Sequence, residues 1–115
     1  MGLPELLHRS AEKQMTEFCR VRTEKDPFAG RVRFRMEEDL ITVFMEGGEE
    51  IGNSPGEDIP VARLRFDSLL RQWTLHYPVE GRRWAFYLNA GPSLDLGKLL
   101  YHLDQDPLRL FWPDR

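Results

Sequence analysis

The chain has 115 residues, 41% hydrophobic and 30% charged, with a formal net charge of −3. This balance predicts one folded domain over residues 1–115 and argues against disorder and against bulk attraction to nucleic acid or anionic lipid. The single cysteine, Cys19, excludes an internal disulfide and a cysteine-based zinc cage, and it favours a reducing, cytoplasmic location. No apolar run has the length of a signal peptide or a membrane span, so we expect no membrane partner.

The first predicted element is a helix from about Pro4 to Arg22. Proline suits the first turn of a helix, where its missing N–H costs nothing. The apolar residues then fall at helical spacing, at Leu7, Ala11, Met15 and Phe18. A proline-containing loop over residues 25–30 ends this element.

After Gly30 the apolar period changes from 3.6 to 2, which is typical of half-buried strands. Five strands are predicted, at Arg31–Glu37, Leu40–Glu46, Val61–Phe66, Gln72–Tyr77 and Arg83–Leu88. An acidic, glycine-rich loop over residues 47–58 separates the second strand from the third. The other connections are short, as in a meander.

A second helix is predicted after the sheet. Ser93 is expected to be its N-cap, with Asp95 in the first turn, and the helix is expected to end near Asp106. The tail, Leu108–Arg115, is too apolar to lie loose in water. The predicted fold is therefore α+β: an N-terminal helix, a five-stranded antiparallel meander sheet, and a C-terminal helix and apolar tail packed on one sheet face.

Alternation along the strands allows the hairpin registers to be tested against one another. The predicted apolar pairs are Met36–Ile41, Phe34–Val43 and Val32–Met45, then Phe66–Trp73 and Leu64–Leu75, then Tyr77–Trp84, Leu75–Phe86 and Trp73–Leu88. Each hairpin then closes with apolar partners on one face. Both helices are expected to cover that face and to leave the other open.

The open face is predicted to be rich in arginine. Its side chains are those of Arg31, Arg33, Arg35, Thr42, Phe44, Arg63, Arg65, Thr74, His76, Arg83, Ala85 and Tyr87. Arginines among aromatic rings are typical of sheets that bind single-stranded nucleic acid, and an acidic protein or a small anion would use the same residues. The candidate binding residues are therefore Arg31, Arg33, Arg35, Phe44, Arg63, Arg65, His76, Arg83 and Tyr87.

The alternative is a solvated sheet face without a ligand. In that interpretation Arg33 lies over Phe44, Arg31 pairs with Glu46, and the acidic loop over residues 46–58 folds across the arginines. The leading hypothesis is nevertheless a non-catalytic binding or accessory domain that holds an anionic partner on this face.

A protein-interaction or homodimerisation module is the second hypothesis. Phe111 and Trp112 would anchor such an interface if they were exposed, because aromatic residues supply much of the energy at protein contacts. An unpaired sheet edge would serve equally well by pairing with a second copy.

An enzyme of unrecognised type is the third hypothesis, and no residue supports it directly. The histidines, His8, His76 and His102, lie on three predicted elements and match no metal-ligand spacing. Cys19 is expected to be buried as a small apolar residue. Adjacent acids, such as those at residues 37–39, fall in turns and loops. General acid/base catalysis needs a carboxyl group whose pKa is raised in a water-poor pocket, and these solvated positions do not offer one. No catalytic residue, metal or cofactor is predicted.

Several motifs resemble those of one family. Residues 59–66 (IPVARLRF), 73–77 (WTLHY) and 82–84 (RRW) resemble a Pro-Val-Ala-Arg-Phe-x-Tyr strand, a Trp-x-Leu-Tyr-Trp strand and a Gly-x-Trp hairpin. Residues 18–20 (FCR) and 111–112 (FW) fit the same pattern. These are motifs of the bacterial family of small proteins called domain of unknown function 3024. The chain departs from it at residues 76–78 (HYP), 80–81 (EG) and 47–50 (GGEE). The resemblance implies similar domain boundaries and supplies no catalytic residue.

Overall fold

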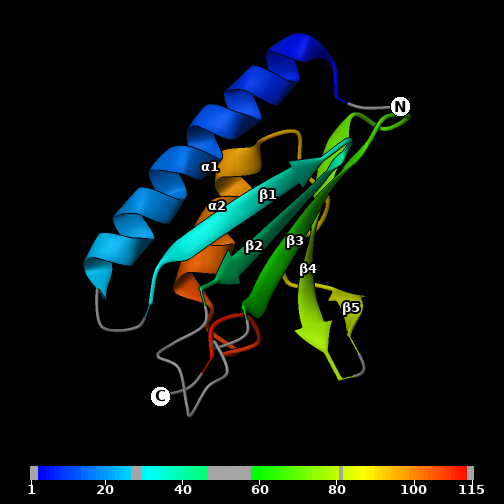
Figure 1. Cartoon of the computed structure of the whole chain (residues 1–115). Helices are drawn as coiled ribbons and strands as arrows, with labels where there is room; N and C mark the ends of the chain where they lie inside the picture. The colour runs from blue at the N-terminus through cyan, green and yellow to red at the C-terminus, as the bar shows by residue number, and fades with distance from the viewer. Residues whose placement is uncertain (1–2, 27–29, 47–57, 81, 114–115) are drawn as a thin grey trace.

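The computed structural model describes residues 3–26, 30–46, 58–80 and 82–113. Its elements follow the order α1 (Glu5–Lys25), β1 (Val32–Glu37), β2 (Leu40–Met45), β3 (Ile59–Asp67), β4 (Gln72–Val79), β5 (Arg83–Phe86) and α2 (Leu96–Gln105). The strands form one antiparallel sheet in the order β1-β2-β3-β4-β5 (Figure 1). The predicted α+β meander is confirmed.

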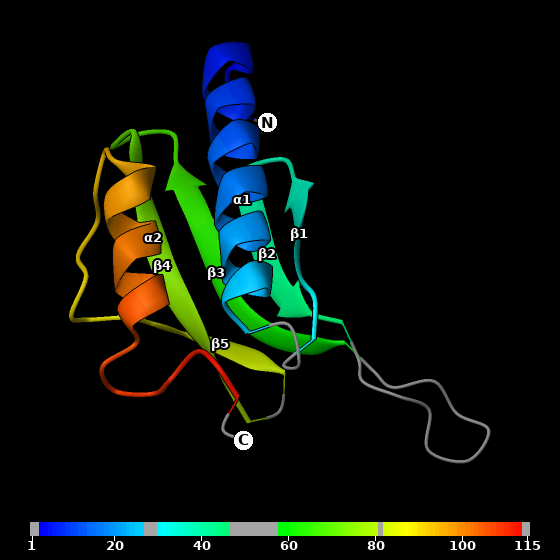
Figure 2. The ribbon, with the colours of Figure 1, turned by 90° about the vertical axis from the view of Figure 1, so that its left-hand side faces the viewer.

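Both helices cover the same face of the sheet (Figure 2). α1 packs against β1, α2 packs against β4, and the helices contact each other. α1 contributes Ala11, Met15 and Cys19 to the core, and α2 contributes leucines at positions 96, 99, 100 and 103. The predicted burial of Cys19 is therefore confirmed, and the helical periodicity explains which side of each helix faces the sheet.

α1 continues to Lys25, beyond the predicted end at Arg22. Arg20 contacts Glu17 at 2.7 Å and Glu24 at 2.8 Å, and such pairs within one helix turn support its last residues. The helix stops at Asp26 because a residue that precedes a proline disfavours the helical conformation.

α2 is capped by Asp95, and the prediction of Ser93 as its N-cap is wrong. The Asp95 carboxylate accepts a hydrogen bond from the Gly97 N–H at 2.9 Å. Ser93 instead exchanges two backbone hydrogen bonds with Trp73, at 2.7 and 3.0 Å, which fixes it beside β4. Its hydroxyl accepts from the Asp95 N–H at 3.0 Å, so it orients the capping residue.

The predicted registers of the first two hairpins are confirmed, and that of the third is wrong by one residue. Met36 lies opposite Ile41 and Phe66 opposite Trp73, as expected. In the third hairpin Tyr77 lies opposite Ala85 instead of Trp84. A shift of one residue sends every side chain of β5 to the other face. The expected pairs Leu75–Phe86 and Trp73–Leu88 are therefore also wrong.

The tail folds back onto the core, as predicted. Its turn is organised by Asp106, whose backbone lies in the left-handed region with φ of 40°. The Asp106 carboxylate accepts hydrogen bonds from the backbone N–H groups of Leu110 at 2.8 Å, Phe111 at 3.2 Å and Trp112 at 3.1 Å. Phe111 is buried in the core, so its side chain serves the fold.

Trp112 and Arg22 join the tail to both helices. The Trp112 indole N–H donates to the Leu103 carbonyl at 2.8 Å, and the Arg22 guanidinium lies 4.0 Å from the centre of the indole. Arg22 also pairs with Asp104 at 2.7 Å. This half-buried network connects the last turn of α1 with the end of α2.

Candidate functional site

The face of the sheet opposite the helices is called the arginine face below. According to the strand registers it carries Arg31, Arg33, Arg35, Thr42, Phe44, Arg63, Arg65, Thr74, His76, Trp84 and Phe86. In the described part of the chain, no helix lies over it. In the alternative interpretation, the acidic loop folds across this face. Its residues 47–57 lie outside the described residues.

Tyr87 does not lie on the arginine face as predicted. It is only 1% exposed and packs in the core, with its ring 4.9 Å from that of Phe111. Arg83 lies at the border of the face: it is opposite Val79 at the start of β5, donates to the Glu80 carbonyl at 3.1 Å, and lines a hollow together with Arg63 and Trp84. Both placements follow from the shifted register of β5. The same shift brings Trp84 and Phe86, which the sequence analysis assigned to the core, onto the arginine face.

Two arginines lie over aromatic rings of this face. The guanidinium of Arg35 is 4.8 Å from the Phe44 ring centre, and that of Arg63 is 4.8 Å from the Trp84 ring centre. Such contacts hold the planar guanidinium in place. Arg35 remains exposed, whereas Arg63 is half-buried. The face is therefore a set of arginine-aromatic pairs.

The expected contacts of Arg33 and Arg31 are wrong. Arg33 pairs with Glu46 at 3.0 Å, and Arg35 takes the place over Phe44. Each contact joins residues on a diagonal across β1 and β2, because Arg33 lies opposite Phe44 and Arg35 opposite Thr42. Long side chains reach diagonal neighbours in a twisted sheet.

Positive charge is balanced on the helices and unbalanced on the arginine face. Helix arginines pair with carboxylates, as in Arg9–Glu5, Arg20–Glu17 and Arg22–Asp104. Among the described residues, no carboxylate lies within ion-pair distance of Arg35, Arg63 or Arg65. The Nε atom of Arg63 is buried and has no hydrogen-bond partner in the described residues. Three arginines of this face are thus without an ion-pair partner among the described residues, whereas Arg33 pairs with Glu46 and the carboxylates of Asp39 and Asp58 lie farther off, in the lining of neighbouring hollows.

Trp84 and Arg63 line two neighbouring hollows in this face, of about 330 and 520 Å3. The first is also lined by Leu40, Arg65 and His76, and by the acidic residue Asp39. The second extends toward Arg35 on β1 and is also lined by Asp58. A flat group beside Trp84 would therefore have guanidinium groups on two sides.

His76 lies in the middle of the arginine face. Its Nε2 shares a hydrogen bond of 2.9 Å with the Thr74 hydroxyl, and its ring meets the edge of Phe86 at 5.8 Å. Burial lowers the pKa of His76 below its ordinary value, and the nearby guanidiniums of Arg65 and Arg63 lower it further. The imidazole is therefore held neutral at neutral pH.

This shift predicts a dependence of stability on pH. The unfolded chain binds a proton at His76 near the ordinary pKa of about 6.5, whereas the folded chain resists it. Stability present above about pH 6.5 is thus lost as the pH falls through the lower folded pKa. In urea titrations at several pH values, His76→Gln should flatten this loss relative to the unsubstituted chain. An unchanged pH dependence in the His76→Gln variant would contradict the assignment.

A family model described as a domain of unknown function (DUF3024) matches residues 3–113. The chain belongs to this family. The family resemblance inferred from the motifs is thereby confirmed over nearly the whole DUF3024 chain. No curated protein and no solved structure matches. The chemistry of this DUF3024 domain must therefore be argued from its own residues.

The remaining candidate groups of the DUF3024 domain are dispersed. His8, His76 and His102 lie on α1, β4 and α2, and no three metal-ligating side chains of the described residues come together. Burial raises the pKa of the Cys19 thiol to about 12, so the thiolate nucleophile is scarce. None of the helices described here combines the length and apolarity needed to cross a membrane.

Proposed function

We propose that this DUF3024 domain is a non-catalytic binding module of the bacterial cytoplasm whose arginine face holds single-stranded nucleic acid. The observation that carries the proposal is the presence of Arg35, Arg63 and Arg65 without carboxylate partners among the described residues, beside Trp84 and Phe86. Guanidinium groups bind phosphates, and aromatic rings accept bases by stacking.

The aromatic rings favour nucleic acid over an acidic protein. Trp84 and Phe86 are half-buried, so neither residue is fully covered, and Arg63 lies over the Trp84 ring. An acidic protein would need the arginines alone, whereas a base stacked on Trp84 would also fill the hollows beside it. Stacking contributes about 1–3 kcal/mol per base and tolerates any sequence. The proposal is therefore binding without strong sequence preference.

Fluorescence anisotropy with a labelled single-stranded oligonucleotide tests this function. Binding should be detectable at about 50 mM salt and weaken as salt is added, since released counterions drive it. Three phosphate contacts by Arg35, Arg63 and Arg65 correspond to a slope of log K against log salt of about −2. Absence of binding at low salt would remove the proposal.

Paired charge reversals locate the binding surface. Arg35→Glu with Arg65→Glu should weaken binding by at least about tenfold, because two phosphate contacts become repulsive. Arg9→Glu with Lys98→Glu changes the net charge equally on the exposed side of the helices and should have a much smaller effect. Equal loss in both double variants would mean that only total charge matters, and the arginine face would not be the site.

A further inference from the structure

β1 forms one edge of the sheet, and its hydrogen bonds to β2 alternate. The Glu46 N–H donates to the Arg31 carbonyl at 2.8 Å, which makes these two residues a hydrogen-bonded pair. In an antiparallel ladder every second pair is of this kind. Arg33 and Arg35 therefore bond to β2, whereas the N–H and C=O groups of Val32, Phe34 and Met36 point away from the sheet.

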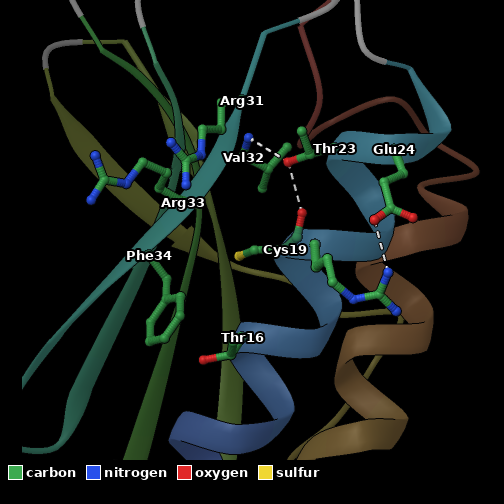
Figure 3. Close-up of a pocket in the computed structure, with 9 residues that line it drawn as sticks. Thr16, Cys19, Thr23, Glu24, Arg31, Val32, Arg33 and Phe34 are labelled. Carbon is green, nitrogen blue, oxygen red and sulfur yellow. Dashed lines mark hydrogen bonds and ion pairs between the residues drawn. The ribbon is translucent and has the colours of Figure 1, made fainter.

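One end of this edge is already closed by α1. The Thr23 hydroxyl accepts the outward Val32 N–H at 3.0 Å and donates to the Cys19 carbonyl at 2.8 Å (Figure 3). In the part of the chain that the structure describes, the outward groups of Phe34 and Met36 have no such partner. The open stretch of the edge thus begins immediately after Val32.

A groove of about 400 Å3 lies between α1 and β1 (Figure 3). Thr16, Cys19 and Thr23 of α1 border it on one side, and Val32 and Phe34 of β1 on the other. The charged residues Arg20, Glu24, Arg31 and Arg33 complete its lining. A further hollow beside Phe34 extends along α1 toward Arg9. The groove gives side chains on the helix face of an added strand a half-apolar place to lie.

The other face of the same edge is basic. Arg31, Arg33 and Arg35 alternate with Val32 and Phe34, so their side chains lie on the arginine face next to the open backbone. Arg33 already pairs with Glu46 and Arg35 lies over Phe44, so an acidic segment would compete with Glu46 for Arg33. We infer that this edge binds an extended acidic segment of a partner protein, which adds to β1 as a sixth strand. Acidic side chains at alternate positions meet the arginines, and the apolar side chains between them enter the groove.

A second copy of the chain is the competing occupant of this edge. Antiparallel pairing of two β1 strands about Phe34 sets Arg33 of one copy opposite Arg35 of the other, and like charges directly opposite across two strands are destabilising. Pairing about Met36 instead sets Arg35 of one copy opposite Glu37 of the other, which are opposite charges. The inference of an acidic partner therefore rests on the arginines beside the open backbone, and self-association is an outcome that the test must be able to detect.

Amide hydrogen exchange, measured by NMR, tests the inference at the backbone. The probe is a short labelled peptide in which glutamate and valine alternate, added to the full chain. Exchange at the Phe34 and Met36 amides should slow on binding, while the amides of Arg33 and Arg35, already bonded to β2, should change little. N-methylation of the valine that faces Phe34 removes one donor and should weaken binding about tenfold. A scrambled peptide with its glutamates in one block should also bind more weakly.

Each contrary result overturns the inference in a different way. Unchanged exchange at Phe34 and Met36 would show that no strand is added. Equal binding of the alternating, scrambled and N-methylated peptides would show that binding depends only on the charge of the peptide and not on strand addition. Slower exchange that rises with protein concentration, without peptide, would identify a second copy as the partner. Arg35 belongs to both proposed surfaces, but amide exchange at Phe34 and Met36 reports on the edge of β1, whereas the oligonucleotide titration also depends on Arg65 and Trp84 in the middle of the sheet.

Discussion

Replacement of Asp106 by alanine is expected to lower the free energy of unfolding by about 3 kcal/mol or more. Asp106 is only 8% exposed. Its carboxylate accepts hydrogen bonds from the backbone N–H groups of Leu110, Phe111 and Trp112. Hydrogen bonds to a charged group contribute about 1.5–3 kcal/mol, and alanine adds the strain of a left-handed backbone at φ of 40°. Urea unfolding followed by tryptophan fluorescence measures the loss.

Two further variants separate the causes at Asp106. Asp106→Gly removes the acceptor but tolerates the left-handed conformation, so it should cost less than alanine by about the strain of that conformation. Asp106→Asn keeps one acceptor oxygen and should cost least of the three. If alanine changed stability by less than about 0.5 kcal/mol, the carboxylate would not organise the tail.

The second large effect on stability is expected at Tyr87. The observed register of β5 buries Tyr87 and exposes Leu88, whereas the register expected from the sequence would bury Leu88 and expose Tyr87. Tyr87 packs against Tyr77 and Phe111, whereas Leu88 is 82% exposed. Tyr87→Ala should therefore cost about 3–5 kcal/mol, and Leu88→Ala less than about 0.5 kcal/mol. Thermal or urea unfolding of both variants gives the comparison directly.

Tyr87→Phe is the matched control. The Tyr87 hydroxyl is buried, and it has no hydrogen-bond partner among the residues described. Removing an unsatisfied buried hydroxyl should leave stability unchanged or raise it by up to about 1 kcal/mol. A large loss at Leu88 with a small loss at Tyr87 would restore the register expected from the sequence.

The third register shows where apolar alternation stops being informative. In β1, in β4 and in residues 63–67 of β3, one set of alternate residues is apolar and the other is mostly polar or charged, and the hairpins that contain them were predicted correctly. In β5 both sets are apolar, since Trp84 and Phe86 alternate with Ala85 and Tyr87. Hydrophobicity then favours neither register. Arg82, with φ of 59°, takes the left-handed position that ends a three-residue connection, and this sets Arg83 opposite Val79.

The candidate site was predictable in part for the same reason. The arginines at positions 33, 35, 63 and 65 alternate with clearly apolar neighbours, so their face followed from the sequence. The aromatic members at positions 84 and 86 depended on the ambiguous strand and were missed. A proline at position 78, which cannot donate to a ladder, was a usable signal that the β4–β5 pairing is unusual.

Ser93 illustrates a second limit. Serine and aspartate are both good N-caps, and the sequence places them only two residues apart. The backbone bridge between Ser93 and Trp73 decided between them, and it is a tertiary contact that no local pattern contains. The prediction failed because serine and aspartate have a similar preference for the N-cap position, and the tertiary pairing of Ser93 with Trp73 determined which of them caps the helix.

The network of Arg22, Asp104 and Trp112 has a consequence for how the domain is made. Its ion pair joins residues separated by 82 positions, between the first helix and the last. The hairpins are local in sequence and require only short loops to close, whereas this contact must wait for residues that lie 82 positions later. During synthesis on a ribosome, α1 therefore emerges before these partners do. Until residues 104–112 are available, the apolar side of α1 lacks part of its cover, and that interval is when the nascent domain is most exposed to aggregation or to chaperones.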